Sequence, residues 1–155
     1  MHLTPWVLAL ALMWPVGTSP PDVVRGWEPP AGPYAAGHRG VDLAAPPGTE
    51  VRAVASGLVT FAGPVAGRGV LTVTLSGRSS PPLRTTYEPV TPLVPRGTTV
   101  TRGQVVATLA PQRKSAPHCP ESCLHWGLLR GDTYLNPLRL PHQGPSRLLP
   151  VHGAP

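Results

Sequence analysis

The chain has 155 residues, of which 23 are proline and 17 are glycine, while 41% are hydrophobic. This length suits one domain, and so many helix breakers exclude a helical bundle. The hydrophobic fraction is too high for a disordered chain. The formal charge is +6, but the basic residues are twelve scattered arginines and the single Lys114. No nucleic-acid surface is therefore predicted.

The N-terminus carries an apolar run from Trp6 to Trp14, followed by the small residues Gly17, Thr18 and Ser19. The run has the length of a signal-peptide core and is too short to span a bilayer. We interpret 1–19 as a cleaved signal peptide, which predicts an extracytoplasmic protein whose mature chain does not span the membrane. Because no basic residue precedes the run, a retained N-terminal anchor or a misassigned start codon stays open.

Residues 20–36 form a Pro-rich lead-in, and the folded domain is predicted over 37–140. Short β-branched runs broken by Gly and Pro predict an all-β fold, a compact antiparallel sheet or sandwich. The tail, 141–155, contains four prolines and no periodicity and is predicted to be disordered. The predicted strands are Glu50–Ala55, Leu58–Ala62, Val70–Leu75, Leu83–Tyr87, Thr98–Val100, Gln104–Leu109 and Leu124–Leu129.

Two separated motifs contain residues that can bind a metal ion. His38 and Asp42 flank Gly40 in a segment whose glycines favour a turn, so both side chains could reach one ion. Further along, Cys123 and His125 alternate with Leu124 and Trp126, and period 2 puts the first two on one face of a strand. Two imidazoles and one carboxylate with an open fourth position form a known type of catalytic zinc site. The alternative is a set of hydrogen-bonded structural residues.

Four motifs in this order resemble the lysostaphin and LytM type of zinc metallopeptidase. They are Gly37–Leu43, Pro47–Val51, Arg96–Ala107 and Leu124–Gly127, with Gly57, Val59 and Gly63 between the second and third. The resemblance extends from about Gly37 to Pro137. It implies a β-rich LytM-type fold, one Zn²⁺ bound by His38, Asp42 and His125, and cleavage of peptide cross-links in bacterial peptidoglycan.

The chain departs from this family at two positions. Active members carry a catalytic His where this chain has Cys123, and a second one where it has Pro89. Loss of a general base or an oxyanion donor typically lowers a rate by ~10² to 10⁴-fold. The family pattern therefore predicts a peptidase, while these substitutions predict reduced activity or none.

Three residues could compensate for the missing histidines. Tyr87 could donate to an oxyanion, and His118 could reach the groove from its loop. The alternatives are packing for Tyr87 and exposure to solvent for His118. Glu88 has the chemistry of a base, but alternation along its strand is expected to point it away from the face shared by Tyr87 and Pro89.

The two cysteines, Cys119 and Cys123, are separated by three residues. In an exported protein they are expected to form a disulfide. If they stay reduced, Cys123 could instead bind zinc as a fourth ligand and close the site.

Together these features predict an exported metalloendopeptidase-like protein whose partner is peptidoglycan peptide. The alternative function is an inactive LytM-type module that binds the cell wall or regulates a separate cell-wall hydrolase.

Overall fold

The computed structural model describes residues 13–17, 20–112, 119 and 122–140. Within these ranges the chain forms eleven β-strands and one 3-10 turn, so the predicted all-β fold is confirmed. The elements are β1 (Val23–Arg25), β2 (Val41–Ala44), β3 (Glu50–Arg52), β4 (Gly57–Val65), β5 (Arg68–Leu75), β6 (Leu83–Glu88), β7 (Val90–Pro92), β8 (Thr99–Val100), β9 (Val105–Leu109), β10 (Cys123–Arg130), β11 (Thr133–Leu135) and η1 (Pro137–Arg139).

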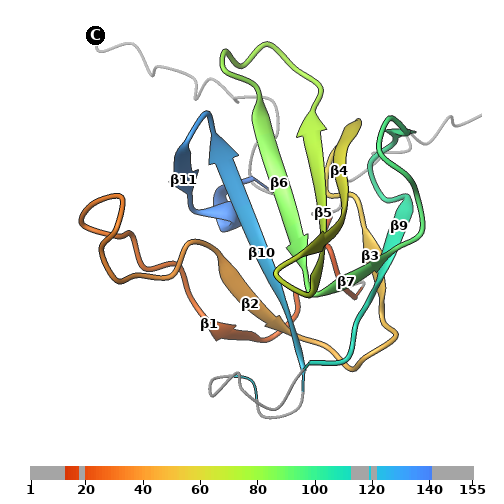
Figure 1. The fold of residues 1–155 in the computed structure, drawn as a ribbon, viewed down its shortest axis with the longest axis horizontal. Helices are drawn as coiled ribbons and strands as arrows, with labels where there is room; N and C mark the ends of the chain where they lie inside the picture. The colour runs from red at the N-terminus through yellow and green to blue at the C-terminus, as the bar shows by residue number, and fades with distance from the viewer. Residues whose placement is uncertain (1–12, 18–19, 113–118, 120–121, 141–155) are drawn as a thin grey trace, which may run out of the picture.

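The larger sheet has the strand order β1-β2-β10-β6-β5-β4-β8, with β11 also paired to β10 (Figure 1). Strand β10 lies inside this sheet and pairs antiparallel with β6 along one edge. Its other edge is shared, because β2 pairs with the first half of β10 and β11 with the second half. The sheet therefore brings β2, near the start of the domain, directly beside β10, near its end.

A smaller antiparallel sheet has the order β3-β9-β7. Apolar residues from both sheets form one buried cluster, as the alternation of β-branched and polar residues predicts. Its largest fully buried side chains include Trp126, Tyr87, Leu43, Leu71, Leu109 and Leu124. The core thus lies on the face of β10 that carries Trp126 and Leu124.

Each of the seven strands predicted from the sequence has a counterpart in the structure. Four short strands, β1, β2, β7 and β11, were not predicted. They have three or four residues each and include Asp42 and Pro92, which strand propensity disfavours. They form because a longer neighbouring strand offers an edge to pair with.

Part of the predicted signal peptide and lead-in contacts the domain. Val16 is 1% exposed within the core, and the Trp14 ring lies edge-on to Trp126 with 6.4 Å between centroids. The Arg52 backbone N–H donates to the Pro15 carbonyl at 2.8 Å. Strand β1, from the lead-in, pairs with β2.

The domain boundaries at residues 19, 36 and 140 stay predictions, and the tail at 141–155 lies outside the described residues.

No helix in the described part of the chain is long and apolar enough to cross a membrane.

Candidate metal centre

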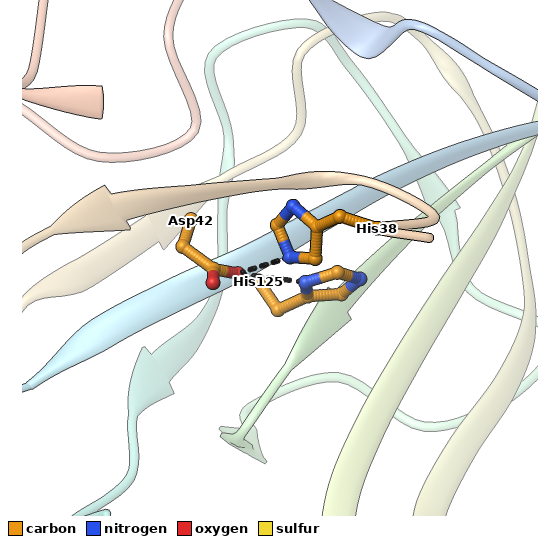
Figure 2. A group of neighbouring side chains, drawn as sticks. All are labelled: His38, Asp42 and His125. Atoms are coloured by element: carbon orange, nitrogen blue, oxygen red, sulfur yellow. Dashed lines mark hydrogen bonds and ion pairs between the residues drawn. The ribbon is translucent and has the colours of Figure 1, made fainter. Parts of the chain in front are cut away.

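Three elements bring His38, Asp42 and His125 together (Figure 2). His38 lies in the turn before β2, Asp42 is in β2, and His125 is in β10. In the antiparallel pairing, His125 is directly opposite Asp42, so both side chains project from the same face of the sheet. Their neighbours Val41 and Trp126 face the core and are fully buried. The alternation predicted for β10 agrees with this arrangement.

The Asp42 carboxylate lies between the two imidazoles. Its Oδ1 atom is 2.7 Å from His125 Nδ1 and 3.2 Å from His38 Nε2. Potential ligand atoms of the three residues all lie within 4.8 Å of one another. Asp42 and His38 are buried, whereas the His125 side chain is 23% exposed. The cluster is therefore held inside the sheet but is accessible on the His125 side.

The lead-in fixes the ring of His38. His38 Nδ1 lies 2.7 Å from the Gly26 carbonyl oxygen, which can only accept a hydrogen bond. Nδ1 therefore donates a hydrogen, and Nε2 is the ring nitrogen directed toward Asp42. A backbone bridge between His38 and Glu28 holds the same turn in place. Metal-binding histidines in proteins commonly donate their other ring N–H in this way.

Gly40 provides the space for His125. A Cβ atom at Gly40 would lie 2.5 Å from the Trp126 carbonyl oxygen and 2.7 Å from His125 Nε2. Real Cβ contacts are longer than this, so any larger residue would displace the imidazole or the strand. The Gly between His38 and Asp42 thus permits close approach of the turn to β10, in addition to the bend that the sequence suggested.

The donor atoms of the cluster are two imidazole nitrogens and one carboxylate oxygen. Zinc takes these ligand types, and three protein ligands with an open fourth position are typical of its catalytic sites. The hydrogen bond from His38 Nδ1 to the Gly26 carbonyl is a further feature of metal-binding histidines, and a merely structural cluster does not require it. The residues present therefore fit a zinc ion.

Cys119 and Cys123 form a disulfide, as predicted, with 5.9 Å between their Cα atoms. Cys123 is two residues before His125 in β10, so its side chain projects from the same face. Cys123 is thus covalently tied to Cys119, four residues earlier in the chain.

Tyr87 lies on the opposite face of the sheet from the cluster. It is directly across from Trp126 and is fully buried, and its hydroxyl accepts a hydrogen bond from the Val54 backbone N–H at 3.2 Å. Burial raises the pKa of Tyr87 to about 12. The structure therefore does not bring Tyr87 to the metal-binding residues, and its packing role accounts for its position.

Glu88 points away from the face of Tyr87, as its position in the strand predicted. It lies directly across from His125 in the pairing of β6 with β10, so the two side chains share a face. The face of Glu88 is the face of the cluster, because Tyr87 faces the core, so the sequence analysis was wrong only in taking the Tyr87 side as the side of the site. Alternating burial of Thr85 and Tyr87 with the more exposed Thr86 and Glu88 is the signal that identifies the correct side.

A shallow groove lies on this same face, over β4, β5 and β6. Thr72 is across from Thr86, which in turn is across from Gly127, so this face of the sheet continues from the groove to β10. The groove is lined by Thr60, Phe61, Val65, Val70, Thr72, Thr74 and Arg84. His118 lies outside the described residues.

A two-sheet antiparallel fold with a His, Asp and His cluster defines the class of lysostaphin-like metallopeptidases. The model of Peptidase family M23 matches residues 36–137, and the chain belongs to this family. It is 41% identical over 145 residues to uncharacterized proteins of Mycobacterium tuberculosis and Mycobacterium bovis. The match covers 90% of this chain and 55% of theirs, so the chain spans about half the length of these relatives.

Solved structures support the fold. A zinc-containing peptidase from Vibrio cholerae is 25% identical with a TM-score of 0.62, over 79% of this chain and 37% of that one. Helicobacter pylori Csd3 is 26% identical with a TM-score of 0.57, over 79% and 32%. The catalytic domain of lysostaphin from Staphylococcus simulans superposes with a TM-score of 0.63 at 21% identity, over 79% and 92%, a likeness of fold alone.

Proposed function

We propose that this chain is a zinc-dependent endopeptidase that cleaves peptide cross-links of bacterial peptidoglycan outside the cytoplasm. The observation that carries the proposal is the convergence of His38, Asp42 and His125 on one accessible face of the sheet. Membership of Peptidase family M23 and the likeness to a zinc-containing peptidase support the same activity.

In this proposal His38, Asp42 and His125 hold the ion through Nε2, the carboxylate and Nδ1. A zinc ion in such a site polarises a carbonyl and lowers the pKa of a water molecule to about 7. The Gly26 carbonyl keeps His38 in the tautomer that leaves Nε2 available. Gly40 leaves the space in which the His125 ring stays oriented toward Asp42.

The groove over β4, β5 and β6 would hold the substrate. Its threonines offer hydroxyl groups to the backbone of an extended peptide, and Arg84 offers a positive charge to peptide carboxylates. The sheet face beneath the groove continues to the face of β10 that carries His125, so a bound peptide could extend to the cluster. Peptidoglycan stem peptides carry carboxylates and suit such a surface.

Glu88 is the residue of this chain that we propose as the proton acceptor. Its Cβ lies on the same face as that of His125, across one strand pairing, where opposed Cβ atoms are typically ~4.5–5.5 Å apart. A carboxylate there can take a proton from an attacking water and so replace the imidazole absent at Pro89. His118 remains a second candidate for this role.

A non-catalytic function is the alternative. Cys123 stands where active relatives of the lysostaphin type carry a catalytic His, and its sulfur is bonded to Cys119, so it can neither accept nor donate a proton. This favours a module that binds peptidoglycan, or regulates a cell-wall hydrolase, without cutting. The groove would then serve for binding alone.

The test measures zinc content and peptide release on the same sample of oxidised protein. An active peptidase should contain one zinc ion and release peptides from purified peptidoglycan, and a chelator should stop the release. His125→Ala should lose both, with circular dichroism as the control for folding. Release that survives chelation would contradict the zinc mechanism. A protein that contains zinc and cosediments with peptidoglycan but releases no peptides would favour the binding module. Peptide release by His118→Ala would show whether His118 acts as the proton acceptor.

A further inference from the structure

Asp42 belongs to two groups of potential metal ligands, and the second includes the cysteines. Its carboxylate and the sulfur atoms of Cys119 and Cys123 all lie within 4.8 Å of one another. The three residues are buried, with exposed fractions of 2%, 8% and 2%. Asp42 is therefore within reach of two imidazoles and of two sulfurs.

The backbone explains this second group. Cys123 is directly across from Ala44 and His125 from Asp42, so both β10 side chains project from one face beside β2. The disulfide holds the Cys119 sulfur against that of Cys123. The β2–β10 pairing thus sets the position of the Cys123 sulfur beside Asp42. Cys119 is only four residues away in the chain, so its thiol stays within reach of Cys123 after the S–S bond is broken.

We propose that reduction of the Cys119–Cys123 disulfide creates a second metal site made of Cys119, Cys123 and Asp42. Two electrons and two protons from a small dithiol break the S–S bond and give two thiols, while the dithiol is oxidised to its own disulfide. Each thiol then releases its proton as its sulfur binds the ion. Two sulfurs and one carboxylate oxygen form a donor set that suits zinc. Metals that favour thiolate ligands bind such a set more tightly than the histidine cluster.

The two sites share one carboxylate, which couples them. When Asp42 binds an ion together with the sulfurs, it is withdrawn from His38 and His125, so reduction moves the ion from nitrogen to sulfur ligands. The open site is then a property of the oxidised protein. This inference does not depend on peptide cleavage, because it concerns only which side chains bind the ion in each redox state.

Cobalt is the probe, since Co²⁺ occupies zinc sites and thiolate ligands give it a charge-transfer band in the near ultraviolet. The oxidised full chain should bind Co²⁺ without this band, and the reduced chain should bind it with the band. Cys119→Ser should lower the intensity of the band under reducing conditions, because one of the two thiolate ligands is lost. His125→Ala should retain it, because His125 belongs only to the other group, although this variant should fail any assay of peptide release.

Folding and thiol content are measured on the same samples. Titration should find two free thiols in the reduced chain, and circular dichroism should match that of the oxidised chain. The proposal is overturned if the reduced, folded protein binds Co²⁺ without the band. It is also overturned if the reduced chain loses its β-sheet spectrum and Co²⁺ does not restore it, or if Cys119→Ser keeps the band at full intensity.

Discussion

Asp42 Oδ1 lies 2.7 Å from His125 Nδ1, although the two residues are 83 positions apart in the chain. The contact exists because β2 and β10 are neighbours in the larger sheet and place these residues directly opposite each other. Both strands also contribute to the core through Val41 and Trp126, so burial of apolar side chains fixes the register that aligns the polar ones.

The first prediction concerns the ligands. His38→Ala and His125→Ala should each lower zinc affinity by more than the ~10–100-fold typical of losing an outer hydrogen-bond partner, because a direct donor is removed. Elemental analysis after dialysis against a weak chelator measures the effect. If either variant retains a full equivalent of zinc, that residue is not a ligand.

Gly40→Ala should weaken zinc binding although it changes no donor atom. The new Cβ would collide with His125 Nε2 and the Trp126 carbonyl. Gly32→Ala is the matched control, since no atom lies within 4 Å of a Cβ there. Zinc titration of both variants should show a loss only for Gly40→Ala. Equal affinities would mean that β10 shifts without disturbing the cluster.

Glu88→Gln should lower the turnover number of peptide release by ~10² to 10⁴-fold, the usual contribution of a general base, while zinc content stays the same. Glu88→Asp should recover part of the activity, since it keeps the carboxylate. Steady-state kinetics with a peptidoglycan-derived peptide separates turnover from KM. A variant that changes only KM would place Glu88 in substrate binding instead.

Tyr87→Phe should destabilise the fold and leave zinc binding and peptide release unchanged. The Val54 backbone N–H would lose its acceptor in the core, at a cost of about 1–3 kcal/mol in the free energy of unfolding. Urea denaturation measures this cost. A drop in turnover with unchanged stability would restore Tyr87 as an oxyanion donor.

Removal of residues 1–19 should also destabilise the domain. Val16 is buried in the core, and burial of a valine side chain contributes about 1.5–3 kcal/mol. A chain beginning at Pro20 should unfold at lower urea than one beginning at Met13, with similar spectra for both. Identical urea midpoints would show that the contacts of Trp14 and Val16 do not stabilise the domain.

Local sequence patterns determined most of the secondary structure. Alternating β-branched residues between Gly and Pro specify β3 to β6 and β8 to β10, because strand periodicity depends only on neighbouring residues. The same alternation predicted that His125 and Trp126 point to opposite faces of the strand. The expected export of the protein and its single pair of cysteines predicted the disulfide of Cys119 and Cys123. The motifs also identified the metallopeptidase family.

Tertiary structure decided which side chains meet. The short strand β2 forms against the long strand β10, and β1 forms in turn against β2. The contact of His38 with the Gly26 carbonyl depends on this pairing, because Gly26 directly follows β1. Alternation correctly put Glu88 on the face opposite Tyr87, but period 2 does not tell which face is the core, so the site was expected on the wrong side of this strand. The core face follows from burial of Tyr87 against the rest of the sheet, a long-range packing effect that no local window contains.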